Sequence, residues 1–111
     1  MEEKKLAGLE PAAVFEYFEA LCAIPHGSHK TKAISDFLVD IAKKQQIRYI
    51  QDESNNIILF ADGTCGLEGH EPVVLQGHMD MVCEKDEGCP IDMDTQGLDL
   101  CHDNLCVFAK G

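Results

Sequence analysis

Apolar positions recur with helical spacing in two stretches of the first half of the sequence. Residues 11–23 carry such positions three or four apart: Val14, Phe15, Phe18, Leu21 and Cys22. Pro11 suits a first helical turn, and Pro25 ends the helix because the residue before a proline avoids helical angles. A second helix is predicted after the turn IPHGSH (24–29), in which Ser28 is a plausible N-cap. Its apolar face comprises Ile34, Phe37, Leu38, Ile41 and Ala42.

The pattern changes to strand-like runs after Gln46. Residues 47–51 and 56–61 predict two strands joined by the polar turn 52–55. The glycine-rich stretch 62–72 predicts an exposed loop. Two short strand candidates near the end of the sequence, 98–101 and 105–109, complete this set.

Residues 72–77 (PVVLQG) are apolar on both faces, which predicts the most buried strand, as in a sheet covered by helices. The order of elements indicates an α/β fold with helices packed on a mixed sheet. The last strand candidate runs into Ala-Lys-Gly without a following helix, so we expect an incomplete domain.

The overall charge narrows the classes of partner. The 111 residues are 45% hydrophobic and 26% charged, and the net charge is −11, from 9 Lys and Arg against 20 Asp and Glu. Nucleic-acid and anionic-membrane surfaces need a basic patch, so we expect neither partner. No apolar run reaches the ~20 residues that span a bilayer, and the first residues lack a signal peptide's apolar core. We therefore expect a cytoplasmic protein.

Six cysteines are then expected to be reduced thiols in the core or on the surface. None forms a C-x-x-C pair, which argues against a zinc ribbon or a thioredoxin-like motif. A mixed metal site made of Cys101, His102 and Cys106 has poor spacing.

An ionisable pair follows the apolar run 72–77. His78 and Asp80 are two positions apart, so in an extended backbone both side chains point to the same side. Ligands of open α/β sheets gather beyond the carboxyl ends of the strands. A metal-ligating imidazole usually donates its other N–H to a carboxylate, which makes this pair a candidate ligand and its support. A structural His–Asp hydrogen bond that caps a strand explains the same pattern.

Three segments occur together in a known family, in this order and at similar spacing: IPHGSH, NNIILF and PVVLQGHMDMV. Over nearly all of residues 9–111, the chain resembles the N-terminal part of an aminoacyl-histidine dipeptidase (Xaa-His dipeptidase, carnosinase-like). These proteins are two-zinc metallopeptidases. The H-M-D segment is shared with acylase and tripeptidase relatives, whereas IPH together with VVLQGHMDMV points to the dipeptidase branch.

The resemblance implies roles for both residues of the pair. His78 resembles the first zinc ligand, and Asp80 resembles the catalytic-site carboxylate that orients its ring. Residues 1–111 would form the N-terminal part of a catalytic domain that hydrolyses Xaa-His dipeptides with two zinc ions, or with other divalent metals. A homodimer is also implied. The bridging aspartate, the general base and the other ligands have no match in this sequence.

Two alternatives remain open at this point. One is a related tripeptidase or acyl-amino-acid amidohydrolase, and the other is a non-catalytic acidic α/β binding module. The other histidines are expected in turns or loops, at His26, His29, His70 and His102. The methionines Met79, Met81 and Met93 are expected to fill the core.

Overall fold

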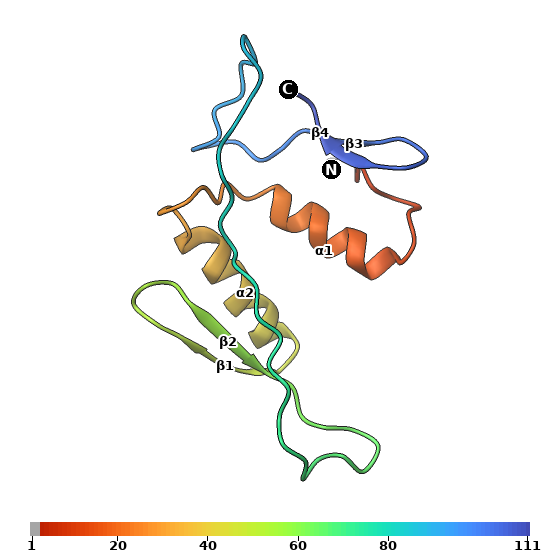
Figure 1. Ribbon diagram of the computed structural model, residues 1–111, viewed down its shortest axis with the longest axis vertical. Coiled ribbons are helices and arrows are strands. Elements are labelled where there is room, and N and C mark those ends of the chain that lie inside the picture. The colour runs from red at the N-terminus through yellow and green to blue at the C-terminus, as the bar shows by residue number, and fades with distance from the viewer. Residues whose placement is uncertain (1–2) are drawn as a thin grey trace.

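The structure is a computed structural model that describes residues 3–111 (Figure 1). Two helices come first, and four short strands follow. The bounds of these elements are α1 Ala12–Cys22, α2 Lys32–Lys44, β1 Arg48–Gln51, β2 Ile57–Phe60, β3 Leu100–His102 and β4 Val107–Ala109. Each lies where the hydrophobic pattern predicts a helix or a strand.

Helix α2 packs against the antiparallel hairpin of β1 and β2. Ile34 and Ala42 are buried as predicted, but Val39 and Ser35 are buried too. The Ser35 hydroxyl donates to Asn55 O at 2.7 Å and accepts from Gln51 Nε2 at 2.8 Å. A fully satisfied hydroxyl can be buried at little cost, so the hairpin contacts a helix face that the apolar pattern alone does not define.

The turn between β1 and β2 is organised by one carboxylate. Asp52 accepts hydrogen bonds from the backbone N–H groups of Ser54 and Asn56, both at 2.9 Å. Asn55 has a φ of 68°, a left-handed conformation that asparagine tolerates better than most residues. The polar sequence of this turn therefore supplies both the acceptor and the conformation that reverse the chain.

A second small core joins α1 to the other hairpin. Leu6, Cys22 and Leu100 are buried together, with Phe15 and Leu98 packed at the edge. The other apolar residues of α1 are less covered than predicted: Val14 and Phe18 are 59% and 44% exposed. Strands β3 and β4 pair antiparallel, and their hairpin contributes Leu100 and Val107 to this small core.

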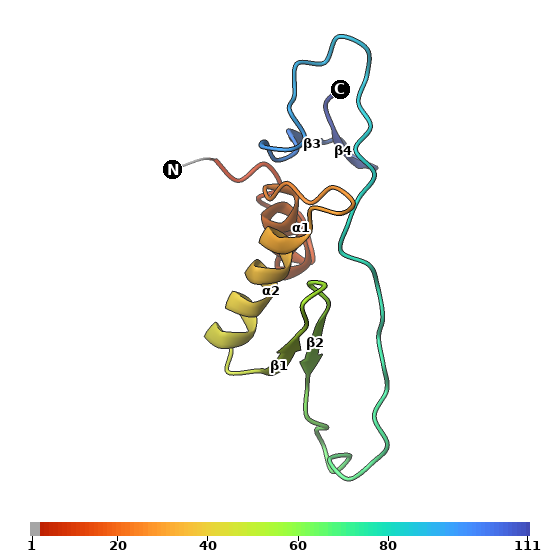
Figure 2. The same ribbon diagram turned by 90° about the vertical axis from the view of Figure 1, so that its left-hand side faces the viewer.

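Residues 61–80 form a long connection that runs past α2 and the first hairpin (Figures 1 and 2). The prediction of a buried strand at 72–77 is wrong for this chain: the residues form no strand, and Val73, Val74 and Leu75 are 85%, 83% and 94% exposed. No strand within the described part pairs with either edge of this segment. The described chain exposes 8960 Å², against about 6,100 Å² for a compact monomer of this mass.

The combination of helices with strands agrees with the predicted α/β class, but the strands form two separate antiparallel hairpins. Parallel pairing in residues 3–111 is limited to one bridge between Gly27 and Met81. The described residues therefore contain antiparallel and parallel pairing, but no single mixed sheet. No described helix is long and apolar enough to cross a membrane.

We expect Ser35→Ala to lower the free energy of unfolding by about 1–3 kcal/mol, because the Gln51 amide and the Asn55 carbonyl lose a partner in a buried place. Urea denaturation followed by circular dichroism measures this. Ser54→Ala, a matched change in the exposed β1–β2 turn, should stay within about 0.5 kcal/mol of the parent. Equal effects of the two substitutions would contradict the packing role of Ser35.

We expect the chain to self-associate as its concentration rises, because contiguous exposed apolar side chains drive association. Val74→Lys should reduce that association in sedimentation velocity, together with the binding of a hydrophobic dye. Glu71→Gln changes the net charge by the same amount without removing apolar surface, and should leave the association unchanged. A parent chain that stays monomeric and binds no dye would contradict this expectation.

Candidate metal-binding site

The candidate site is assembled where the loop after α1 meets the end of the long connection. Met81 N donates to His26 O at 3.0 Å, and Ser28 N donates to Met81 O at 3.1 Å. Gly27 is buried between the two segments, and a Cβ atom there would lie 2.6 Å from Cys83 Sγ. A side chain at this position would therefore require the Cys83 thiol to turn away, at a contact between two segments that are more than fifty positions apart.

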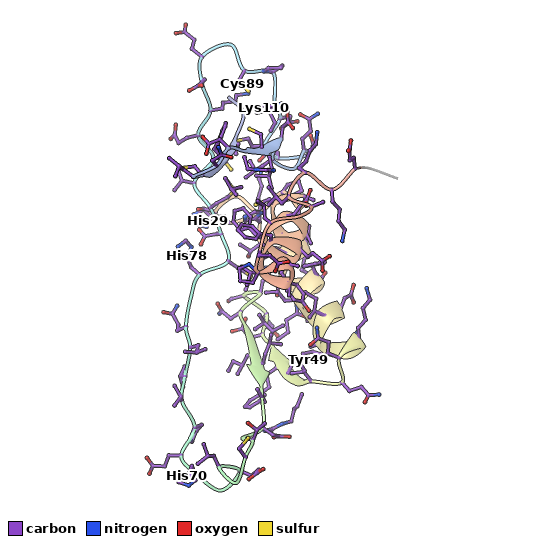
Figure 3. All side chains as sticks on the ribbon, turned by 90° about the vertical axis from the view of Figure 1, so that its right-hand side faces the viewer. His29, Tyr49, His70, His78, Cys89 and Lys110 are labelled. Carbon is purple, nitrogen blue, oxygen red and sulfur yellow. The ribbon has the colours of Figure 1, made fainter. Side chains whose placement is uncertain are left out.

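His78 and Asp80 meet as the sequence predicts. His78 Nδ1 lies 3.0 Å from Asp80 Oδ1, and the side chains are 81% and 37% exposed. His78 projects from the long connection away from the helices (Figure 3). Its Nε2 has no hydrogen-bond partner within the described chain, so the outer edge of the ring is open to a ligand.

Asp80 has a second partner that sequence reasoning missed. The Ser28 hydroxyl donates to Asp80 Oδ2 at 2.6 Å. The expectation that Ser28 caps the second helix is wrong: the N-cap of α2 is Thr31, and no side-chain bond caps the helix. The turn that continues from Gly27 to Lys30 carries Ser28 toward Asp80 instead. No local pattern signals a contact between residues so far apart in sequence.

The two hydrogen bonds also set the electrostatics of the carboxylate. The Ser28 hydroxyl, and then the His78 ring, hold the pKa of Asp80 below its usual value because both stabilise the charged form. Asp80 therefore keeps its negative charge toward the imidazole throughout the neutral range.

The other histidines do not join this pair in a cluster. His26 Nδ1 lies 2.5 Å from Ile24 O inside its own turn, and His29 has a left-handed φ of 68°. His70 lies at the tip of the loop that the long connection forms, far from His78 (Figure 3). His102 is the last residue of β3, which corrects the prediction of a turn residue.

The donor set decides what this chain can hold. The part of the chain that the structure describes has no group of three or more His, Cys, Asp or Glu side chains that could hold a metal ion. A catalytic zinc ion normally takes three protein ligands. His78 fits one ligand position, since Asp80 engages Nδ1 and leaves Nε2 open, but these residues do not make a complete site. All six cysteines are free thiols.

The chain is similar in sequence and in structure to two known dipeptidases. The chain is 31% identical over 107 residues to the cytosol non-specific dipeptidase of Escherichia coli (strain K12), with 96% of this chain aligned. The structure matches the crystal structure of aminoacylhistidine dipeptidase from Vibrio alginolyticus with a TM-score of 0.89 and 32% identity, again over 96% of this chain. The resemblance to aminoacyl-histidine dipeptidases is confirmed.

The chain spans 22% of the length of each of these two dipeptidases. The open arrangement of its helices and hairpins is thus one that a solved dipeptidase also adopts within a much longer chain. No family model matches the chain.

We expect the Asp80 carboxyl to titrate below the ordinary aspartate pKa of about 3.9. Its contacts with Ser28 and His78 should contribute fully above that pH, and should be lost as the pH falls through the lowered pKa. The carboxyl carbon shift in an NMR titration measures this directly. Titration at or above the ordinary value would mean that these hydrogen bonds do not persist in solution.

Proposed function

We propose that this chain is the N-terminal part of the catalytic domain of a zinc-dependent dipeptidase that hydrolyses Xaa-His dipeptides. The observation that carries the proposal is the 3.0 Å contact between His78 Nδ1 and Asp80 Oδ1. The His78 side chain is highly exposed, so its other ring nitrogen is accessible. Similarity to two proteins named as dipeptidases, over 96% of this chain, supports it.

Within this proposal, the two residues divide the work. Asp80 Oδ1 accepts a hydrogen bond from the Nδ1–H of His78, which fixes the tautomer and leaves the Nε2 lone pair for the metal. The carboxylate charge also makes the imidazole a stronger ligand. Bound zinc would polarise the scissile carbonyl and lower the pKa of a bound water molecule. The further ligands and the general base would come from outside residues 1–111.

The remaining parts of the proposal follow the resemblance. The protein would work in the cytosol as a homodimer, with two zinc ions in the complete site. The Escherichia coli relative is named as a cytosol dipeptidase, which is consistent with that location.

A broader dipeptidase is a second candidate, and one observation favours it. The Escherichia coli relative is called non-specific, whereas the Vibrio alginolyticus relative is called an aminoacylhistidine dipeptidase. The identities to these two proteins, 31% and 32%, do not separate the candidates.

We expect His78→Ala in the full-length protein to lower both bound zinc and turnover, because it removes a direct ligand. Asp80→Asn keeps a hydrogen-bonding group but removes the charge, so turnover should fall by about 10–100-fold with the fold preserved. Zinc content, turnover and the thermal melting temperature are measured for both variants and for the parent.

Two matched controls test whether these effects are local. His70→Ala and Asp62→Asn make the same chemical changes on the exposed loop 61–71, and should keep parental zinc content and turnover. The isolated 111-residue chain should be inactive, because it offers one matched ligand. Parental turnover in Asp80→Asn would reduce the pair to a structural hydrogen bond.

The two substrate candidates separate in a direct comparison of kcat/KM. If the protein is an Xaa-His dipeptidase, glycyl-histidine should be preferred over glycyl-leucine by roughly tenfold or more, since a site that hydrogen-bonds a side chain rejects analogues that lack it. Comparable values for the two substrates would favour the broader dipeptidase. Hydrolysis of neither substrate, by zinc-loaded protein, would overturn both candidates.

A further inference from the structure

We infer that Ser28 is a positioning residue for the His78–Asp80 pair: its hydroxyl fixes the Asp80 carboxylate in the orientation that presents Oδ1 to the imidazole. The significance of this pair for catalysis rests on the proposed function. The geometry of Ser28 itself is independent of that proposal.

The two oxygens of Asp80 are shared between two partners. Oδ2 accepts from the Ser28 hydroxyl at 2.6 Å, and Oδ1 faces His78 Nδ1 at 3.0 Å. The torsion that turns an aspartate carboxylate is broad, so the side chain alone does not select one orientation. A donor on Oδ2 holds the plane of the carboxylate and thereby directs Oδ1.

Few other contacts fix the orientation of the His78 and Asp80 side chains. They lie on a connection that forms no strand, and the His78 side chain is 81% exposed. Ser28, by contrast, comes from the loop after α1, where its own N–H bonds Met81 O and where Lys30 N closes a turn on Gly27 O at 2.9 Å. The orientation of the pair is therefore set by a group anchored on a different segment.

A purely structural role for the hydroxyl explains less. Two backbone hydrogen bonds, Met81 N to His26 O and Ser28 N to Met81 O, already join the segments without it. The hydroxyl is 3.5 Å from Met81 O but 2.6 Å from the carboxylate, so the shorter contact is the one to Asp80. The contact that remains for the hydroxyl is the one that orients the carboxylate.

The experiment is nitrogen-15 NMR of the His78 ring. It uses the 111-residue chain without zinc, at a dilution where this chain is monomeric. In the parent, Nδ1 of the neutral ring should carry the proton, because Asp80 accepts from it. Ser28→Ala should shift the ring toward the tautomer distribution of Asp80→Ala. Ser28→Thr keeps the hydroxyl and should retain the parental distribution, and Ser54→Ala serves as the matched control.

A second arm shows whether Ser28 acts through Asp80. Adding Ser28→Ala to Asp80→Ala should change the His78 ring signals no further, because the carboxylate that transmits the effect is gone. In the full-length protein, Ser28→Ala should weaken zinc binding by less than the roughly 10–100-fold expected for Asp80 variants. The amide signals of Ser28 and Met81 report whether the backbone bridge persists.

An unchanged His78 tautomer in Ser28→Ala overturns the inference, as does a further change in the double variant. The tautomer measurement needs neither zinc nor substrate. A protein that lacks dipeptidase activity but shows the expected tautomer shift therefore defeats the proposed function while it supports the positioning role of Ser28.

Discussion

The short parallel bridge between residues 26–28 and Met81 is the contact on which the candidate site depends. Two backbone hydrogen bonds, of 3.0 and 3.1 Å, join the loop after α1 to the end of a connection that is otherwise exposed. Gly27 is buried at this contact, and a Cβ atom there would require Cys83 Sγ to move. This pairing brings the Ser28 hydroxyl into hydrogen-bond contact with Asp80, which in turn contacts His78.

Much of the fold follows from local sequence patterns. Helical spacing and alternation define both helices and both hairpins, since the signals lie within a few residues of one another. The apolar run at 72–77 is different: apolar composition indicates a buried environment but does not supply the elements that cover it. In this chain Val73, Val74 and Leu75 face solvent, so the prediction of burial failed although the hydrophobic signal is real.

The candidate site also has one part that the sequence predicts and another part that it does not. The contact between His78 and Asp80 follows from their two-residue spacing, and the structure has it at 3.0 Å. Ser28 was expected to cap α2 because a serine just before a helix usually does. It bonds Asp80 instead, and that choice depends on a tertiary contact across 52 positions. Likewise, Ser35 is buried through bonds to the hairpin that no apolar pattern marks.

We propose that His78 offers Nε2 to a metal ion while Asp80 is hydrogen-bonded to Nδ1. A crystal structure of the full-length protein grown with zinc, with anomalous data at the zinc edge, tests this most directly. We expect an anomalous peak at about 2.0–2.1 Å from His78 Nε2, with the Asp80 carboxylate bonded to Nδ1. Zinc bound through Nδ1, or a fully loaded site that leaves His78 without a metal, would contradict it.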